Sequence, residues 1–233
     1  MEQEVRLNKF LSEAGVCSRR EADRMVEKGI LVDGVPAQMG QKVRASQKIE
    51  VDHKRIQIEE EKVLLAFNKP RGIVCTTSKK DKDNIVDYIN YGKRIYPIGR
   101  LDKDSEGLIL LTNQGELVDK ILRGSNYHEK EYIVTVNKKI TPEFLRAMGS
   151  GVPILDTVTR PCELEQIGPR TFRIILTQGL NRQIRRMCEY FSYRVIELTR
   201  VRVMNIRLGR LKSGTYRKIV GKELEELVKL LEK

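Results

Sequence analysis

One short stretch of the chain holds residues whose types and spacing could support catalysis. Arg100 and Asp102 stand on either side of a leucine, with glycines close by in both directions. The apolar run from Leu108 to Leu111 then predicts a buried strand. A carboxylate in a glycine-flanked turn, beside a cation and leading into a rigid core, is how an enzyme presents a reactive acid. Asp102 is therefore the candidate catalytic residue.

The sequence around Asp102 also resembles a known signature. Gly99-Arg-Leu-Asp102, followed by Ser105-Glu-Gly-Leu and then by Leu-Leu-Thr-Asn113, resembles the pattern of the RsuA/RluB/E/F family of RNA pseudouridine synthases. The resemblance covers nearly the whole chain, from Arg6 to the final helix. It implies an enzyme that isomerises a uridine in RNA to pseudouridine, with Asp102 as the catalytic acid or nucleophile.

Pseudouridine formation moves uracil from a nitrogen–ribose bond to a carbon–ribose bond, with no oxidation and no energy donor. It needs an ionised carboxylate that acts on the sugar–base unit as nucleophile or base. The resemblance assigns Arg185 as the cation that keeps Asp102 charged, and Tyr132 as the residue beside carbon 5 of the uracil. Helical spacing puts Arg185 at the border of a packed apolar face. Taken alone, an exposed helix cation and a core tyrosine are the alternative interpretations.

Several cations are candidates for RNA contact. The target uridine must swing out of its stack, and Arg100 is placed to fill the vacated space with its guanidinium plane. Lys69, in Asn68-Lys-Pro-Arg-Gly72, matches the first motif of the family, which implies that it supports the floor of the active site or a phosphate. Arg182 and Arg186 lie on the helix face opposite the packed one, where we expect RNA backbone. Ordinary surface cations are the alternative interpretation for each.

The placement of the net charge of +12 favours a polyanion as partner. Residues 1–52 hold nine basic and nine acidic residues, so the excess lies further along the chain. Residues 182–218 alone hold eleven basic residues and two acidic ones. A solvated basic face remains the alternative to a nucleic-acid footprint.

The first 52 residues read as a small α+β module. Helical apolar spacing begins at Leu7, and Ser18 with Glu21 forms a capping box for a second helix that runs to Lys28. Asp33-Gly34 predicts a tight hairpin turn. The pattern resembles the alpha-L (ribosomal S-four-type) RNA-binding module, which implies that the second helix contacts RNA. An exposed amphipathic helix is the alternative, and the balanced charge suggests a clamp of modest affinity. The implied contacts are Arg19, Arg20 and Arg24.

The fold class expected from the whole pattern is α+β. We predict the small module over residues 1–52, a polar linker over 53–62, and a catalytic domain with a mixed, mainly antiparallel sheet over 63–233. Strands are expected at 63–67, 73–75, 108–111, 131–136, 172–176 and 194–204. Helices are expected at 116–122, from Pro142, from an N-cap at Asn181 to Phe191, and at 223–231.

Composition excludes several classes of protein. The four cysteines form no CxxC pair and there are only two histidines, so we expect neither a metal nor a disulfide framework. No phosphate-loop or dinucleotide motif occurs, which agrees with a reaction that needs no cofactor. No apolar run approaches the ~20 residues of a membrane span, and the N-terminus does not read as a signal peptide. We therefore expect a cytoplasmic monomer without membrane contact.

The target RNA depends on the branch of the family. Segments 128–136, 151–155 and 178–191 resemble most the branch that acts on 23S rRNA. A stem-loop of 23S rRNA is therefore the expected substrate, with a tRNA anticodon loop as a second one. Two alternatives stay open from the sequence, namely an enzyme that modifies small-subunit rRNA and a non-catalytic rRNA-binding assembly factor.

Overall fold

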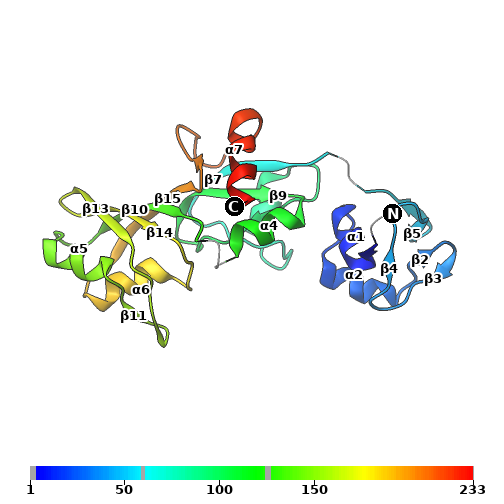
Figure 1. Cartoon of the computed structure of the whole chain (residues 1–233), viewed down its shortest axis with the longest axis horizontal. Helices are drawn as coiled ribbons and strands as arrows, with labels where there is room; N and C mark the ends of the chain where they lie inside the picture. The colour runs from blue at the N-terminus through cyan, green and yellow to red at the C-terminus, as the bar shows by residue number, and fades with distance from the viewer. Residues whose placement is uncertain (1–3, 59–60, 124–126, 233) are drawn as a thin grey trace. The chain divides into compact units, whose positions relative to one another are not determined.

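The computed structural model describes residues 4–58, 61–123 and 127–232 (Figure 1). The chain divides into two compact units. The first unit runs to Val63 and includes Tyr91–Ile95 and Asn113–Gly115, and the second contains the rest. The boundaries expected from the sequence, 1–52, 53–62 and 63–233, remain our proposal for the domain organisation.

Two helices contribute to the apolar core of the first unit. The side chain of Ser18 accepts a hydrogen bond from the backbone N–H of Glu21 at 3.2 Å, as the capping box predicts. The second helix ends at Val26, two residues earlier than expected. The apolar faces of both helices, with Phe10 and Leu11 buried, pack against the neighbouring strands. These helices are α1 (Leu7–Glu13) and α2 (Arg19–Val26).

Short antiparallel strands complete this unit. Asp33 and Gly34 both adopt positive φ, 51° and 80°, which matches the twist of a two-residue hairpin turn. In the larger sheet the strand order is β3-β2-β5-β6, and β1 pairs with β4 separately. The strands are β1 (Val5–Arg6), β2 (Leu31–Val32), β3 (Val35–Pro36), β4 (Lys42–Val43), β5 (Ile49–Val51) and β6 (Lys54–Ile56).

The first half of the linker proposed over residues 53–62 contains a strand that the sequence did not predict. Strand β6 pairs antiparallel with β5 there, and Asp52 and His53 turn the chain with positive φ. The strand was missed because it is short and polar, and because its turn lacks the usual glycine. The acidic residues Glu59 and Glu60, on which the linker prediction partly depended, lie outside the described residues.

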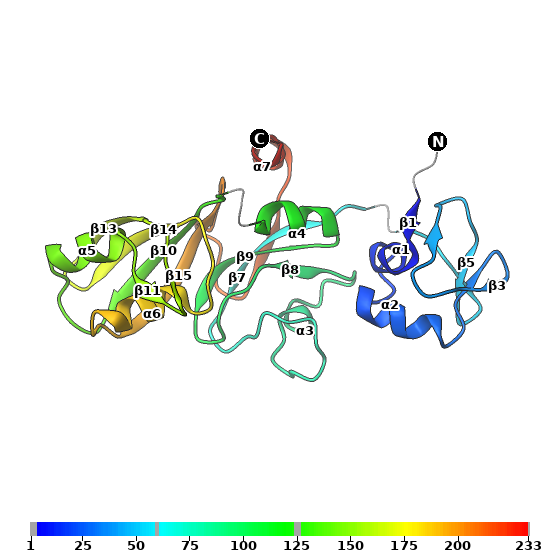
Figure 2. The same cartoon turned by 60° about the horizontal axis from the view of Figure 1, so that its bottom comes forward.

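A large sheet forms the framework of the second unit. Within the described residues, nine strands join in one sheet with the main order β13-β14-β10-β15-β9-β7-β17 (Figures 1 and 2). The pairing of β9 with β15 is parallel and the other described pairings are antiparallel, which confirms the expected mainly antiparallel sheet. The strands are β7 (Leu64–Lys69), β8 (Tyr96–Ile98), β9 (Glu106–Thr112), β10 (Lys130–Val136), β13 (Glu163–Gly168), β14 (Thr171–Leu176), β15 (Val195–Val203), β16 (Ile206–Arg207) and β17 (Tyr216–Lys218).

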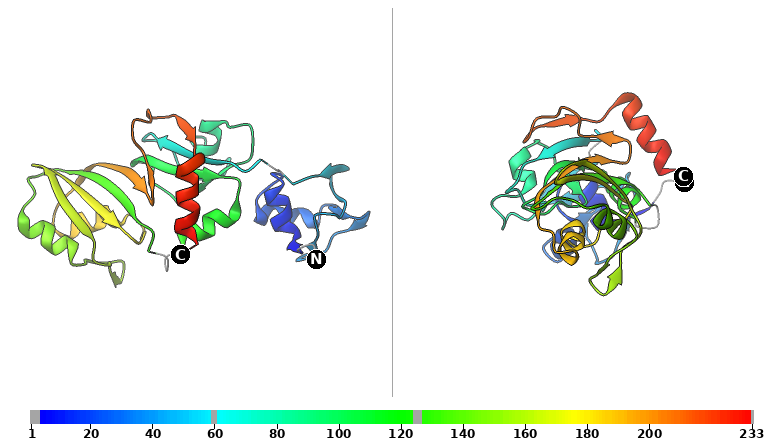
Figure 3. Two further views of the ribbon diagram at one scale, coloured as in Figure 1. Left: turned by 45° about the horizontal axis from the view of Figure 1, so that its top comes forward. Right: turned by 90° about the vertical axis from the view of Figure 1, so that its left-hand side faces the viewer.

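Two apolar clusters hold the helices of this unit on the sheet. Helices α5 (Pro142–Gly149) and α6 (Gln183–Tyr190) pack on the β10–β14 side, where Phe144 and Met187 are buried (Figure 2). Helices α4 (Gly115–Leu122) and α7 (Gly221–Leu231) pack near β7 and β9 through Ile121 and Leu227 (Figure 3). The remaining elements are α3 (Ile85–Ile89) and the hairpin of β11 (Pro153–Ile154) and β12 (Thr157–Val158).

The parallel contact between β9 and β15 joins the two parts of the large sheet. Gly107 lies opposite Arg200 in this pairing and has a φ of 104°. A Cβ atom at this position would come within 2.4 Å of the backbone oxygen of Arg200. Only glycine allows the strands to approach so closely. The contact matters for function because the loop that contains Asp102 leads directly into β9.

The strand expected at residues 73–75 is wrong. This segment makes only an isolated bridge between Val74 and Asn84. Pro70 and Gly72 lead into the segment, and Gly72 adopts a φ of 89°, so the chain turns away instead of pairing. None of the helices in the described part of the chain is long and apolar enough to cross a membrane.

Candidate active site

The loop between β8 and β9 carries Asp102 and is held from both sides. Leu101 is buried, and its backbone N–H donates to the Sγ atom of Cys75 at 3.3 Å. The backbone N–H of Ser105 donates to the carbonyl of Asp102 at 3.1 Å. The side chain of Asp102 itself is 30% exposed. The loop therefore presents a carboxylate to solvent from a fixed backbone.

Lys69 stabilises this loop through hydrogen bonds from its buried side chain to backbone carbonyls. It has no exposed surface, and its Nζ donates to the carbonyls of Pro70 and Ile73 at 2.9 Å and to that of Lys103 at 3.5 Å. Burial lowers the pKa of Lys69, and nearby acidic groups, with Cys75 and Asp104 the largest, partly offset this effect. Of the two roles expected for Lys69, this position suits support of the floor and leaves no surface for a phosphate.

Helix α6 begins later than the sequence suggested. Its N-cap is Arg182, in the left-handed region at φ 50°, so the expected N-cap at Asn181 is wrong. The side chain and carbonyl of Asn181 instead accept hydrogen bonds from the guanidinium of Arg186. The side chain of Gln183 accepts from the N–H of Leu180 at 3.0 Å and closes the turn before the helix. This turn directs Arg182 toward the Asp102 loop.

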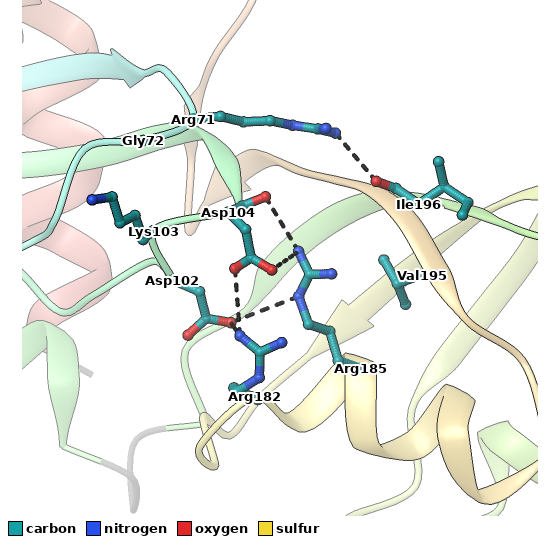
Figure 4. A pocket seen from close by; sticks show the side chains of 9 residues that line it. All are labelled: Arg71, Gly72, Asp102, Lys103, Asp104, Arg182, Arg185, Val195 and Ile196. Carbon is teal, nitrogen blue, oxygen red and sulfur yellow. Dashed lines mark hydrogen bonds and ion pairs between the residues drawn. The ribbon is translucent and has the colours of Figure 1, made fainter.

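Arg185 extends to the same loop from the buried face of helix α6. Its side chain is only 9% exposed. One terminal nitrogen, Nη2, donates to the carbonyl of Asp104 at 3.3 Å and to the hydroxyl of Ser105 at 3.2 Å, and lies 3.4 Å from a carboxylate oxygen of Asp104. The Nε atom lies 3.9 Å from Oδ2 of Asp102 and is buried without a hydrogen-bond partner (Figure 4).

Arg182 connects the two carboxylates of the loop from the solvent side. Its Nη1 atom lies 3.6 Å from Oδ2 of Asp102 and 3.4 Å from Oδ1 of Asp104 (Figure 4). Burial raises the pKa of Asp104, but the charge of Arg185, its own backbone N–H and the charge of Arg182 more than offset this, so that its pKa is lowered overall. Two carboxylates and two guanidiniums therefore face one another.

These residues line a cavity of about 590 Å³, a size typical of ligand sites. The apolar residues Val195 and Ile196 form another part of its wall, opposite the acids (Figure 4). Arg71 extends across the cavity, where its Nη2 donates to the carbonyl of Ile196 at 3.4 Å and its Nε lies 3.6 Å from Glu106. A flat, partly apolar group that carries polar edges, such as a nucleobase, fits this combination of surfaces.

Tyr132 lies on β10, half-buried, with Arg200 opposite it on β15. It packs against the apolar cluster of α5 and α6, and among the described residues it is not one that lines the cavity. Arg200 is buried, donates from Nε to the carbonyl of Leu108 at 2.7 Å, and has no hydrogen-bond partner at Nη2.

The cations expected to contact RNA are mostly on the surface. Arg100 is exposed beside Asp102, and Arg186 is half-buried through its bonds to Asn181. Arg24 is paired with Glu21 on α2. Of the site residues predicted from the sequence, the structure brings Asp102, Arg182 and Arg185 together within one unit. The remaining exposed cations of this set are Arg19 and Arg20.

Sequence reasoning missed Asp104, Ser105 and Arg71 as members of the site. Ser105 lies within the signature that follows Asp102, and Arg71 lies two residues after Lys69 in the first motif. Both positions are therefore close to residues that the sequence did identify as candidates. Asp104 gave no separate signal. Among the described residues, no group of three or more possible ligands could hold a metal ion.

Comparisons with known proteins identify the family of the chain. A family model described as RNA pseudouridylate synthase matches residues 63–190, and one described as S4 domain matches residues 5–49. The chain is 55% identical over 231 residues to the dual-specificity RNA pseudouridine synthase RluF of Salmonella typhi, covering 98% of this chain and 80% of the relative.

More distant relatives cover the chain equally well. Ribosomal large subunit pseudouridine synthase B of Bacillus subtilis (strain 168) is 35% identical over 232 residues, covering 95% of each chain. A crystal structure of a pseudouridylate synthase superimposes with a TM-score of 0.70 at 25% identity, covering 97% of this chain and 99% of the other. The chain therefore belongs to the RNA pseudouridine synthase family and includes an S4 domain.

Proposed function

We propose that Asp102 is the carboxylate that reacts with the target uridine. The observation that carries the proposal is the position of Asp102 on the wall of the cavity, between the guanidiniums of Arg182 and Arg185. The two guanidiniums place positive charge beside this carboxylate. An ionised oxygen is what attack on the ribose, or removal of a proton from it, requires.

The reaction breaks the bond between ribose and N1 of uracil and forms a bond from ribose to carbon 5. Asp102 acts on the sugar as nucleophile or base while the detached ring turns in the cavity. As nucleophile it bonds to C1′ of the ribose and is displaced when carbon 5 attacks; as base it takes a proton from the ribose and returns it in that step. The proton on carbon 5 is then lost and N1 ends with a proton, so no electrons enter or leave. Tyr132 removes the proton from carbon 5 or stacks on the ring.

RNA binding must first expose the uridine. Swinging a base out of a stack costs a few kcal/mol, less if the base is already unpaired. We propose that Arg100, which is exposed beside Asp102, fills the vacated stack, and that Arg182 and Arg186 contact the backbone. The S4 domain adds a second contact through α2, with Arg19, Arg20 and Arg24 as its cations.

We propose a stem-loop of 23S rRNA as one substrate and a tRNA anticodon loop as a second. The names of two relatives support this choice, since one is called a dual-specificity RNA pseudouridine synthase and the other a ribosomal large subunit pseudouridine synthase. The protein acts as a monomer in the cytoplasm and uses no cofactor. Residues 1–52 serve as the RNA-binding module and residues 63–233 as the catalytic domain.

Release of tritium from RNA labelled at carbon 5 of uridine tests both the activity and the substrate. Purified protein is incubated with a 23S rRNA transcript, a tRNA pool and, as a control, a small-subunit rRNA transcript. We expect release from the first two only. Release from small-subunit rRNA alone would show that small-subunit rRNA is the substrate instead. Tight RNA binding without tritium release would identify a non-catalytic assembly factor. Pseudouridine mapping of cellular RNA, with and without the protein, then locates the nucleotide.

A further inference from the structure

A second carboxylate faces the arginines beside Asp102. Asp104 lies 3.4 Å from Arg182 and 3.4 Å from Arg185, closer than Asp102 lies to either of them. An acid in a cleft that must receive a polyanion weakens binding by repulsion. Its presence therefore calls for a role other than contact with RNA.

The hydrogen bonds of Arg185 suggest that role. The side-chain hydrogen bonds of Arg185 come from Nη2, to the carbonyl of Asp104 and the hydroxyl of Ser105, and the Asp104 carboxylate lies 3.4 Å from the same atom. Ser105 is itself buried, so this set of acceptors belongs to the fixed part of the loop. The Nε atom has no acceptor, and its nearest ion-pair partner is Oδ2 of Asp102 at 3.9 Å.

A guanidinium is planar, so fixing one of its nitrogens with several acceptors limits where the others can point. Holding Nη2 of Arg185 at residues 104 and 105 directs its Nε–H toward Asp102. A small movement of the loop would convert the distance of 3.9 Å into a hydrogen bond. We propose that Asp104, together with Ser105, is a positioning residue that keeps Nε of Arg185 aimed at Asp102. This inference rests on the proposed role of Asp102.

Charge supports the same assignment. Asp104 is 54% exposed and Arg182 is 41% exposed, whereas Arg185 is almost buried. A buried guanidinium is costly unless charged or polar partners surround it. Asp104 supplies a negative charge that takes no part in the reaction. Arg185 therefore keeps a charged partner when Asp102 leaves its ion pair during the reaction.

The test compares Asp104→Ala and Asp104→Asn with Asp83→Asn as the matched control. Asp83 is 61% exposed and forms an ion pair with Lys103 in the same region, so its change removes a similar surface charge outside the arginine pair. We expect Asp104→Ala to lower kcat for tritium release about 10- to 100-fold while KM stays level or falls. Asp104→Asn should recover part of kcat, because its amide oxygen keeps a polar partner beside Nη2, where the carboxylate oxygen now lies at 3.4 Å. Asp83→Asn should leave kcat unchanged.

A double-mutant cycle with Arg185→Lys separates positioning from a general structural role. If Asp104 acts through Arg185, the double variant Asp104→Ala/Arg185→Lys loses several-fold less kcat than the product of the single losses. Multiplicative losses, or a kcat of Asp104→Ala equal to that of Asp83→Asn, would overturn the inference. Melting temperatures of all variants exclude unfolding as the cause.

The same measurements distinguish failure of this inference from failure of the proposed function. Multiplicative losses together with an inactive Asp102→Asn variant would leave Asp102 as the reacting acid and remove only the role of Asp104. An active Asp102→Asn variant would remove both.

Discussion

The Nε atom of Arg185 lies 3.9 Å from Oδ2 of Asp102 and is buried without a hydrogen-bond partner. A buried donor without an acceptor costs about 1–3 kcal/mol, so its retention beside a partly exposed acid favours a functional reason. The pair comes from segments that are distant in the sequence, and the fold brings them to one cavity.

Substitution of Lys69 by methionine tests whether the lysine supports the loop or binds RNA. Lys69 has no exposed surface, and it links carbonyls on two loops, including that of Lys103 next to Asp102. We expect kcat to fall at least tenfold through loosening of this loop, with the RNA dissociation constant and its salt dependence unchanged. A smaller salt slope, measured by filter binding at several salt concentrations, would instead indicate a phosphate contact.

Substitution of Arg182 by alanine should weaken RNA binding and flatten its salt dependence. Each phosphate contact that is lost lowers the salt slope by about one. Arg186→Ala should act in the same direction but less strongly, because its guanidinium is already bound to Asn181. Arg146→Ala is the control, since this exposed arginine pairs with Glu143 on α5. Equal slopes for Arg182→Ala and the control would show that Arg182 is outside the footprint.

Substitution of Gly107 by alanine should destabilise the second unit. The new Cβ would meet the backbone of Arg200 at 2.4 Å, and the φ of 104° is unfavourable for any L side chain. We expect the free energy of unfolding in urea to fall by about 2–5 kcal/mol. Gly168→Ala is the matched control, because its nearest neighbour would lie at an ordinary 3.5 Å. Similar values for the two variants would contradict the close packing of β9 and β15.

The pH dependence of stability should report the ion pairs of Asp104. Its pKa is lowered in the folded protein, so its carboxylate stabilises the fold above its unfolded-state pKa, and this contribution is lost as pH falls through the folded-state pKa. The difference in melting temperature between the native protein and Asp104→Asn should therefore shrink as pH is lowered from 6 to about 3.5. A difference that stays constant with pH would show that the charge of Asp104 does not stabilise the fold.

Much of the fold could be predicted because its signals are local. The apolar run at 108–111, the capping box at Ser18 and the proline at the start of α5 each identify an element without reference to the rest of the chain. Strand β6 and helix α3 were missed because they are short. Pairing with β5 stabilises β6, and that contact is tertiary rather than local.

The site was predictable only where a motif marked it. Asp102 and Arg185 were both named from the sequence, yet their separation depends on the turn at Arg182, whose left-handed backbone no pattern indicated. Asp104 forms ion pairs with the same two arginines as Asp102, namely Arg182 and Arg185. These contacts depend on the folded conformation of the loop, so no local sequence pattern indicates them. Sequence patterns identify residue types, whereas packing decides which of them meet.

The most direct test of the central claim is tritium release by Asp102→Asn. This change removes the reactive charge and keeps nearly the same side-chain shape, so RNA binding should persist. With RNA labelled at carbon 5 of uridine, we expect the native protein to release tritium and Asp102→Asn to release none while it binds the same RNA with similar affinity. Release by Asp102→Asn at a rate near that of the native protein would contradict the assignment of Asp102 as the reacting acid.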